Sequence, residues 1–197
     1  MPEPDASTVR ITDPTRIRAL SHPLRLRLLD LLAEEGTATA TRCAELTGES
    51  VASCSFHLRM LAKYGFIEPA ERVGREKPWQ LTARSRDIRP DFDDPASVRA
   101  VEVMAGLYVE HEVERIRTWL ATGPSESPDW VHASTITGSA FWATLEELAE
   151  VSRTLQSLTD RFEGRGTDPS LRPPDARPVR LFGVTSVDVE QERRHPT

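Results

Sequence analysis

The sequence predicts an α+β fold, mostly α, because two different patterns divide the chain. Apolar side chains recur every three or four residues over most of it, as in amphipathic helices, whereas residues 66–82 indicate two short strands around a charged turn. The 197 residues are 38% hydrophobic and 28% charged, which is ordinary for one large or two small globular domains. No run approaches 18 apolar residues and the polar N-terminus lacks a signal-peptide core, so we expect a cytoplasmic protein.

Three helices are expected within the first fifty residues. Asp13 followed by Pro14 predicts the start of the first helix. The second spans Pro23 to Gly36 and places its leucines on one face. A shorter helix follows a threonine cap and ends at the turn around Gly48.

The stretch SVASCSFHLRMLAKYGFI, residues 50–67, predicts a fourth helix directly after that turn. Ser50 is its expected N-cap, because a serine hydroxyl can accept a hydrogen bond from the first free N–H groups. Cys54, Leu58 and Leu61 are spaced by four and three residues, so they form its inward stripe. Two helices joined by a tight turn define a helix-turn-helix motif.

A hairpin is expected after the fourth helix. Phe66 and Ile67 predict its first strand, and the segment WQLT predicts the returning strand. Three basic residues lie near its tip: Arg72, Arg75 and Lys77. Helices, a helix-turn-helix and a basic hairpin, in this order, predict a winged helix-turn-helix domain at residues 10–90.

The remaining residues predict a long helix and a small C-terminal α/β region. Residues 94–123 form a helix with a broad apolar face, which we expect to be a dimerisation helix unless residues 124–197 cover it. In that last region, strands expected at 130–137 and 178–190 flank an amphipathic helix at 144–162. The region is predicted to be an effector pocket or a dimer brace, since its aromatic cluster fits either a core or a ligand cage. The cluster consists of Trp119, Trp130, Phe141 and Trp142.

Residues 15–83 resemble the ArsR-type winged-helix transcriptional regulators. The resemblance is carried by RALSHPLRLRLLDLL, by CAELTGESVASCSFHLRMLAKYGFI and by the hairpin ERVGREKPWQLT. It implies a homodimer on a palindromic operator in double-stranded DNA, with one recognition helix in each major groove and a wing on the backbone or in the minor groove. It also implies that a small-molecule effector changes operator affinity, commonly by relieving repression.

The candidate DNA-contacting residues lie on the outward face of the fourth helix and on the hairpin. They are Ser50, Val51, Ala52, Ser53, Ser55, Phe56, His57, Arg59, Lys63, Arg72, Arg75 and Lys77. The cations suit phosphates, the serines suit phosphates or base edges, and the apolar groups suit thymine methyls. We therefore expect T-rich half-sites with few bidentate contacts, and more discrimination by DNA shape. The alternatives are that Phe56 packs sideways, that His57 is a packing histidine and that the hairpin charges are solvated.

Metal sensing and bound cofactors are not expected. Many ArsR-type regulators bind metal through paired cysteines, but the matching positions here, Thr39 to Thr41, have no thiol. Cys43 and Cys54 are interpreted as small core residues. His111 lies on the long helix among glutamates, and we interpret this stretch as solvated.

The net charge of −6 is unevenly distributed. Residues 1–90 have 14 Lys and Arg against 12 Asp and Glu, whereas residues 91–197 have 11 against 19. Residues 50–89 alone have 8 basic and 4 acidic side chains, so a local basic patch accompanies the predicted motif. The acidic total and the apolar outer face favour an alternative, a winged-helix protein-interaction module without specific DNA binding. An enzyme is not expected, because the histidines and cysteines form no catalytic set.

Overall fold

The computed structural model describes residues 8–71, 77–83, 85–166 and 168–194. The chain divides into two compact units, one formed by residues 1–122 with 166–169 and the other by 123–165 with 170–197. Within the described residues, no helix is both long enough and apolar enough to cross a membrane.

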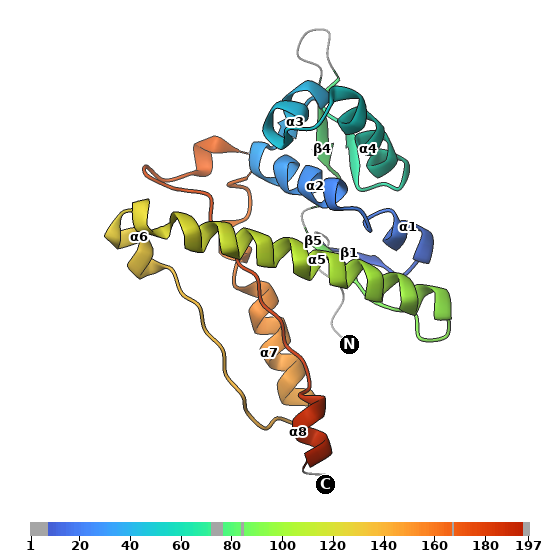
Figure 1. Cartoon of the computed structure of the whole chain (residues 1–197), viewed down its shortest axis with the longest axis vertical. Coiled ribbons are helices and arrows are strands. Elements are labelled where there is room, and N and C mark those ends of the chain that lie inside the picture. The colour runs from blue at the N-terminus through green and yellow to red at the C-terminus, as the bar shows by residue number, and fades with distance from the viewer. Residues whose placement is uncertain (1–7, 72–76, 84, 167, 195–197) are drawn as a thin grey trace. The chain divides into compact units, whose positions relative to one another are not determined.

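Four helices build the first part of unit 1 (Figure 1). They are α1 (Pro14–Arg18), α2 (Pro23–Glu35), α3 (Ala40–Thr47) and α4 (Val51–Lys63). Their starts agree with the sequence: Asp13 caps α1, Thr39 caps α3 and Ser50 caps α4, each with its side-chain oxygen. Gly48 takes a left-handed φ of 74°, which lets the chain turn sharply between α3 and α4.

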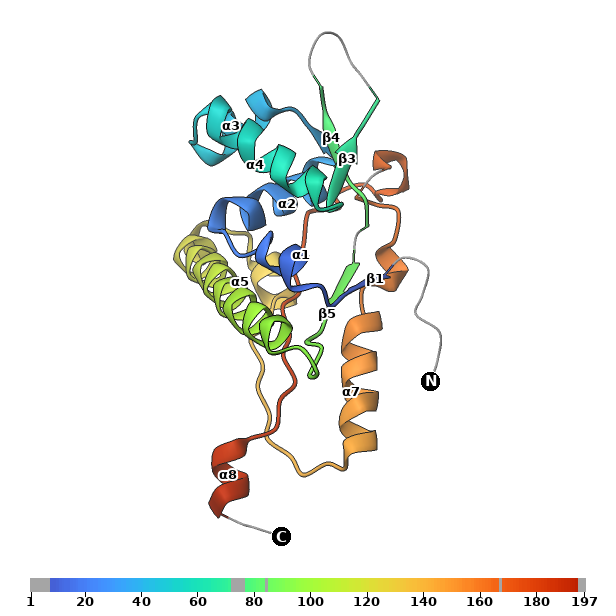
Figure 2. The ribbon, with the colours of Figure 1, turned by 90° about the vertical axis from the view of Figure 1, so that its right-hand side faces the viewer.

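A three-stranded antiparallel sheet completes the winged helix-turn-helix architecture, which confirms the predicted fold class. The hairpin strands are β3 (Ile67–Pro69) and β4 (Trp79–Leu81), and β2 (Thr37–Ala38) pairs with the other edge of β4. In Figure 2, β3 and β4 of this hairpin, which we call the wing, lie beside α4. A separate parallel pair joins β1 (Thr8–Ile11) to β5 (Ser85–Ile88), with Ile11 opposite Ile88.

The hydrophobic core of unit 1 lies between α2, α4, the sheet and the start of α5 (Pro95–Thr122). Leu28, Leu58 and Leu61 are fully buried in it, together with Phe66. Ala100 and Met104 of α5 also belong to this core, so the long helix is packed against the winged domain along its first turns.

The start of α5 is anchored by a buried serine. Ser97 is 0% exposed, its Oγ donates to the Thr12 carbonyl at 2.7 Å, and the Asp91 N–H donates to the same Oγ at 3.0 Å. Both hydrogen-bonding functions of this hydroxyl are therefore used, as a buried hydroxyl requires. They tie α5 to the segment between β1 and α1.

Unit 2 contains helices and 3₁₀ turns but no strand among its described residues. Its elements are η1 (Gly123–Ser125), α6 (Pro128–Ala133), α7 (Leu145–Ser157), η2 (Asp160–Phe162) and α8 (Val189–Arg194), with η3 (Pro169–Leu171) at the boundary between the units. The expected capping box of Thr144 and Glu147 is present at the start of α7. The helix ends at Ser157, before the predicted residue 162.

The strands expected at 130–137 and 178–190 do not form. The prediction of a small C-terminal α/β region is therefore wrong. Residues 130–133 belong to α6, and residues 178–188 form no regular element. A strand needs a neighbouring strand and an apolar surface against which its side chains pack. Here Ile136 is 70%, Val179 81% and Val184 67% exposed, so β-branched residues alone were a misleading signal.

Leu58→Ala should destabilise the protein far more than Leu145→Ala, because only the first position is in the core. Leu58 is 0% exposed and Leu145 is 85% exposed. We expect Leu58→Ala to lower the free energy of unfolding by about 2–5 kcal/mol, measured by urea denaturation followed by circular dichroism. A similar loss for both variants would contradict this placement of the core.

Candidate nucleic-acid interface

Helix α4 is held in a defined rotation by its caps and its inner stripe. The Ser50 Oγ accepts the Ser53 N–H at 3.1 Å, and Cys54, Leu58 and Leu61 are all 0% exposed. Because residues on an α-helix are spaced by about 100°, burying this stripe turns the opposite face outward. The predicted inward positions are therefore the observed ones.

The outward face of α4 is apolar near its N-terminus and basic near its C-terminus. Val51 and Phe56 are 48% and 52% exposed, and Ala52 is exposed beside them. Arg59 and Lys63 are exposed one and two turns further along, and α4 contains no Asp or Glu. The helix thus presents apolar groups and two cations to solvent without a competing carboxylate of its own.

The serines of α4 are less available than the sequence suggested. Ser53 and Ser55 are half-buried, and the Arg59 Nη1 donates a hydrogen bond to the Ser55 Oγ at 2.9 Å. This contact holds the guanidinium against the helix surface. Ser50, which is exposed, already uses its Oγ as the N-cap acceptor.

His57 packs against His22, a residue that was not among the predicted DNA contacts. Its ring centroid lies 4.3 Å from that of His22, and Phe56 meets the His57 ring edge-on at 5.1 Å. The His57 Nδ1 is buried and has no hydrogen-bond partner among the described residues. His57 therefore packs α4 against the start of α2. The His22-Pro23 pair was the feature of the sequence that could have indicated this contact.

Both stacked histidines favour the neutral form. Burial lowers the pKa of His22, and the nearby Arg25 lowers it further, while Glu49 opposes the shift. Burial also lowers the pKa of His57, with His22 and Arg25 acting in the same direction and Glu49 against it. The His22 Nδ1 accepts the Leu24 N–H at 3.2 Å and so caps α2, which requires that nitrogen to be unprotonated.

The described part of the wing carries one of its three predicted cations. The Lys77 ammonium lies 4.5 Å from the centroid of the Trp79 ring, and Trp79 itself is buried on β4. Lys77 is exposed and lies two residues before β4. Arg72 and Arg75 lie outside the described residues.

Helix α1 is tied to the end of α4 by one arginine. The Arg16 Nε donates to the Tyr64 carbonyl at 3.2 Å, and its guanidinium lies 5.6 Å from the centroid of the Phe66 ring. Tyr64 is the C-cap residue of α4. A displacement of α1 would therefore also move the C-terminal end of α4, the helix that carries the candidate interface.

A second polar cluster joins α2 to the middle of α5. The His111 Nε2 lies 2.6 Å from the Asp30 Oδ2, and Arg115 lies 3.5 Å from Asp30 and 3.5 Å from Glu34. Glu112 is 2% exposed, so this part of α5 is not the solvated stretch that the sequence suggested.

Ligand atoms of Asp30, His111 and Glu112 lie within 4.8 Å of one another, the kind of spacing that could hold a metal ion. The Arg115 guanidinium already lies beside Asp30 in this cluster. We interpret the arrangement as an ion-pair network that fixes α5 on α2.

The two cysteines are not placed for metal binding. Both are 0% exposed. Burial raises the pKa of the Cys43 thiol to about 11, and the proximity of Cys54 and Glu35 adds to the shift. A metal-binding cysteine must be a thiolate, and Cys43 is a neutral core thiol near pH 7.

Residues 20–70 match the family model of a helix-turn-helix domain, which confirms the motif predicted from the sequence. Together with the antiparallel strands of the wing, helices α1–α4 form a winged helix-turn-helix architecture. The sequence resembles the ArsR type of this architecture. No curated protein matches it significantly.

Solved structures of low sequence identity are similar to parts of the chain. The homodimeric winged helix-turn-helix DNA-binding domain (fragment 1–100) of Mb0332 from Mycobacterium bovis, described as a possible ArsR-family transcriptional regulator, is 23% identical, with a TM-score of 0.32. That match covers 50% of this chain and 77% of the other. An apo double mutant of ZitR from Lactococcus lactis is 21% identical with a TM-score of 0.33, covering 73% of this chain and 84% of the other.

Acidification should destabilise the protein through the stacked histidines. Because their folded-state pKa values are lowered, the unfolded chain takes up protons first as the pH falls through about 6.5, so the free energy of unfolding decreases. The full stabilisation is present above that pH and lost below the folded-state values. We expect His57→Phe to flatten this dependence in urea unfolding between pH 7.5 and 5.5. The exposed control His132→Asn should keep the parent slope, and a parent slope in His57→Phe would contradict the account.

Proposed function

We propose that this protein is a sequence-specific DNA-binding transcriptional regulator that acts as a homodimer and represses the genes it controls. The observation that carries the proposal is the outward face of α4, exposed from Val51 to Lys63 and free of acidic side chains. Such a helix fits the major groove, where apolar groups contact thymine methyls and cations contact phosphates. Residues 10–90 are assigned to DNA binding in this proposal.

Phosphate contacts would position α4 on the duplex. Arg59 and Lys63 lie in its C-terminal half, and Lys77 lies on the wing, so exposed basic groups are present on both elements of the candidate interface. Val51, Ala52 and Phe56 would then meet base edges. This division favours T-rich half-sites, with the remaining discrimination supplied by the shape of the duplex.

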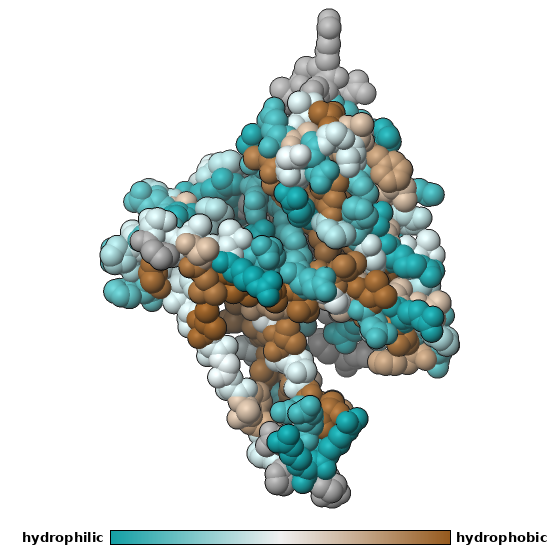
Figure 3. Space-filling model, in the orientation of Figure 1, coloured by the Kyte–Doolittle hydropathy of each residue, from teal (hydrophilic) through white to brown (hydrophobic). Residues whose placement is uncertain are grey.

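The proposed dimer would form through the dimerisation helix expected at residues 94–123, which corresponds to α5 (Pro95–Thr122). This helix has 28 residues, about 42 Å in length at 1.5 Å per residue. Its exposed apolar side chains include Val109, Ile116 and Leu120, at 43%, 37% and 53%, which lie on one side of the helix. In Figure 3, apolar side chains gather along α5. A second copy covering this surface would place two α4 helices on a palindromic operator.

The proposal includes no metal. Two observations support this choice: Cys43 is a neutral, buried thiol, and Asp30 already lies beside Arg115 and His111. Regulation is assigned to an effector of another kind. In the other candidate, a winged helix that binds protein partners, α4 would not distinguish one DNA sequence from another.

Lys63→Gln should weaken binding to every DNA by a similar factor, because a phosphate contact carries no sequence information. We expect a several-fold loss of affinity and a salt dependence reduced by about one unit of slope per protomer. Fluorescence anisotropy on DNA from the protein's own upstream region, with unrelated DNA beside it, measures both. Arg117→Gln is the matched control, since Arg117 is 72% exposed on α5. Parent-like binding by Lys63→Gln would contradict the proposed orientation.

Phe56→Ala should remove a preference for T-rich half-sites while the protein remains folded, since this ring is half exposed. The expected result is a several-fold smaller ratio of affinities between T-rich and T-poor operators in the same anisotropy assay. The control Leu46→Ala truncates an exposed apolar residue of α3 and should leave this ratio of affinities unchanged. An unchanged ratio in Phe56→Ala would exclude this ring from base contact.

A further inference from the structure

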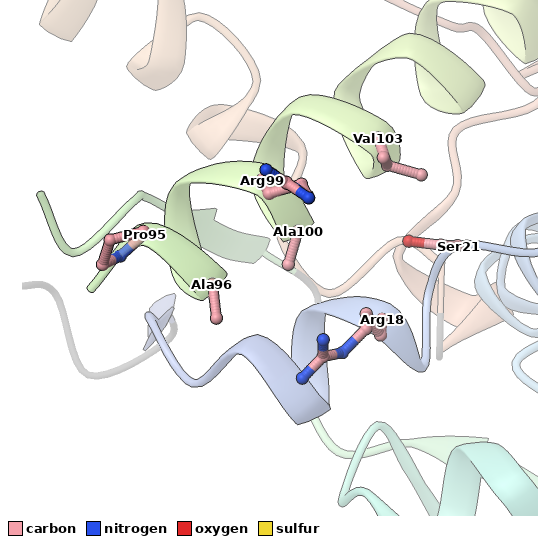
Figure 4. Close-up of a pocket in the computed structure, with 7 residues that line it drawn as sticks. All are labelled: Arg18, Ser21, Pro95, Ala96, Arg99, Ala100 and Val103. Atoms are coloured by element: carbon pink, nitrogen blue, oxygen red, sulfur yellow. The ribbon is translucent and has the colours of Figure 1, made fainter.

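The strongest unassigned feature of unit 1 is a hollow of about 440 Å³ between α1 and the first turns of α5 (Figure 4). It arises because α5 presents the small side chains of Ala96 and Ala100 to α1, with Val103 one turn further along. A volume of this size is within the usual range for small-molecule sites. Two arginines, Arg18 of α1 and Arg99 of α5, also line it.

These two arginines differ in their contacts from several other arginines that the structure describes. Arg42, Arg115, Arg117 and Arg177 each lie within 4.0 Å of a carboxylate. Within the described residues, the guanidinium groups of Arg18 and Arg99 have no hydrogen bond or ion pair. Asp94, which directly precedes α5, pairs with neither of these two arginines. Its Oδ1 instead accepts a hydrogen bond from the Ala96 backbone N–H at 2.9 Å.

We propose that this hollow, called the α1–α5 groove, binds a small amphipathic monocarboxylate whose hydrocarbon part lies on Ala96, Ala100 and Val103. A guanidinium offers two parallel N–H donors that match the two oxygens of a carboxylate, so Arg18 and Arg99 would hold the anionic end. The small aliphatic side chains bury the hydrocarbon part. An amphipathic cation of the same length lacks the matching charge and is excluded.

The position of the groove connects such a ligand to the candidate interface. Arg16, two residues before Arg18, donates to the carbonyl at the end of α4. The opposite wall belongs to α5, whose exposed face is the proposed dimer surface. A ligand that changes the spacing of α1 and α5 would alter how two α4 helices are presented. This regulatory consequence depends on the proposed function, whereas ligand binding itself does not.

Octanoate is the probe, with octylamine as the control of equal chain length and opposite charge. Isothermal titration calorimetry on the full chain should detect octanoate binding at least tenfold tighter than octylamine binding. Arg18→Gln and Arg99→Gln should each weaken octanoate binding about tenfold, whereas Arg117→Gln should not. Ala96→Phe, which fills the groove from an exposed helix position, should abolish binding, and circular dichroism verifies that each variant is folded.

Three outcomes of the calorimetry would overturn the proposal: no octanoate binding at millimolar concentration, equal binding of octanoate and octylamine, or binding that is insensitive to the two arginines. The last outcome would place the fatty chain on another apolar surface. A change of oligomeric state in Ala96→Phe, measured by sedimentation, would assign the groove to a second copy of the chain instead. Octanoate binding in a protein that fails to bind DNA would keep the ligand site and reject the proposed function.

Discussion

Burial of Cys54, Leu58 and Leu61 is the constraint on which the candidate interface depends. These side chains enter the core beside Phe66 and so fix the rotation of α4 about its own axis. The exposure of Phe56 and the cations at the end of α4 is a consequence of this packing. Turning the helix by 100° so that Arg59 takes the place of Leu58 would bury a charged residue and expose a leucine, each at a cost of about 1 kcal/mol or more.

Charge is distributed so that an acidic protein can still present a basic surface. The whole chain has a net charge of −6, but α4 itself contains no carboxylate. Interactions with phosphates are screened over about 10 Å at 0.1 M salt, so the local arrangement outweighs the total. The acidic second half of the sequence would then disfavour non-specific contacts made by other surfaces.

Local signals in the sequence predicted most of unit 1. The caps at Asp13, Thr39 and Ser50 act within three residues, and the stripe of α4 depends only on helical spacing, so each is visible without tertiary information. The prediction of strands in unit 2 was wrong because a strand forms only where a partner strand, often distant in the sequence, lies beside it. The same limit applies to β2, which pairs with a strand some forty residues later.

The polar contacts of the site were the hardest to predict, because they join residues far apart in the chain. The sequence left two roles open for His57, DNA contact and packing, because its stacking on His22 depends on how α2 packs beside α4. His111 was interpreted as solvated from its acidic neighbours, and its hydrogen bond to Asp30 spans 81 residues. A sequence indicates which side chains can make such contacts, and only the packing selects their partners.

The most direct test of the account is hydroxyl-radical footprinting of the full chain on DNA from its own upstream region. A homodimer that presents two α4 helices should protect two similar patches whose centres are about 10–10.5 base pairs, or a multiple of this, apart. Lys63→Gln should require a several-fold higher protein concentration to give the same two patches. Uniform weak protection along the duplex, or a single patch, would contradict the proposed dimeric regulator.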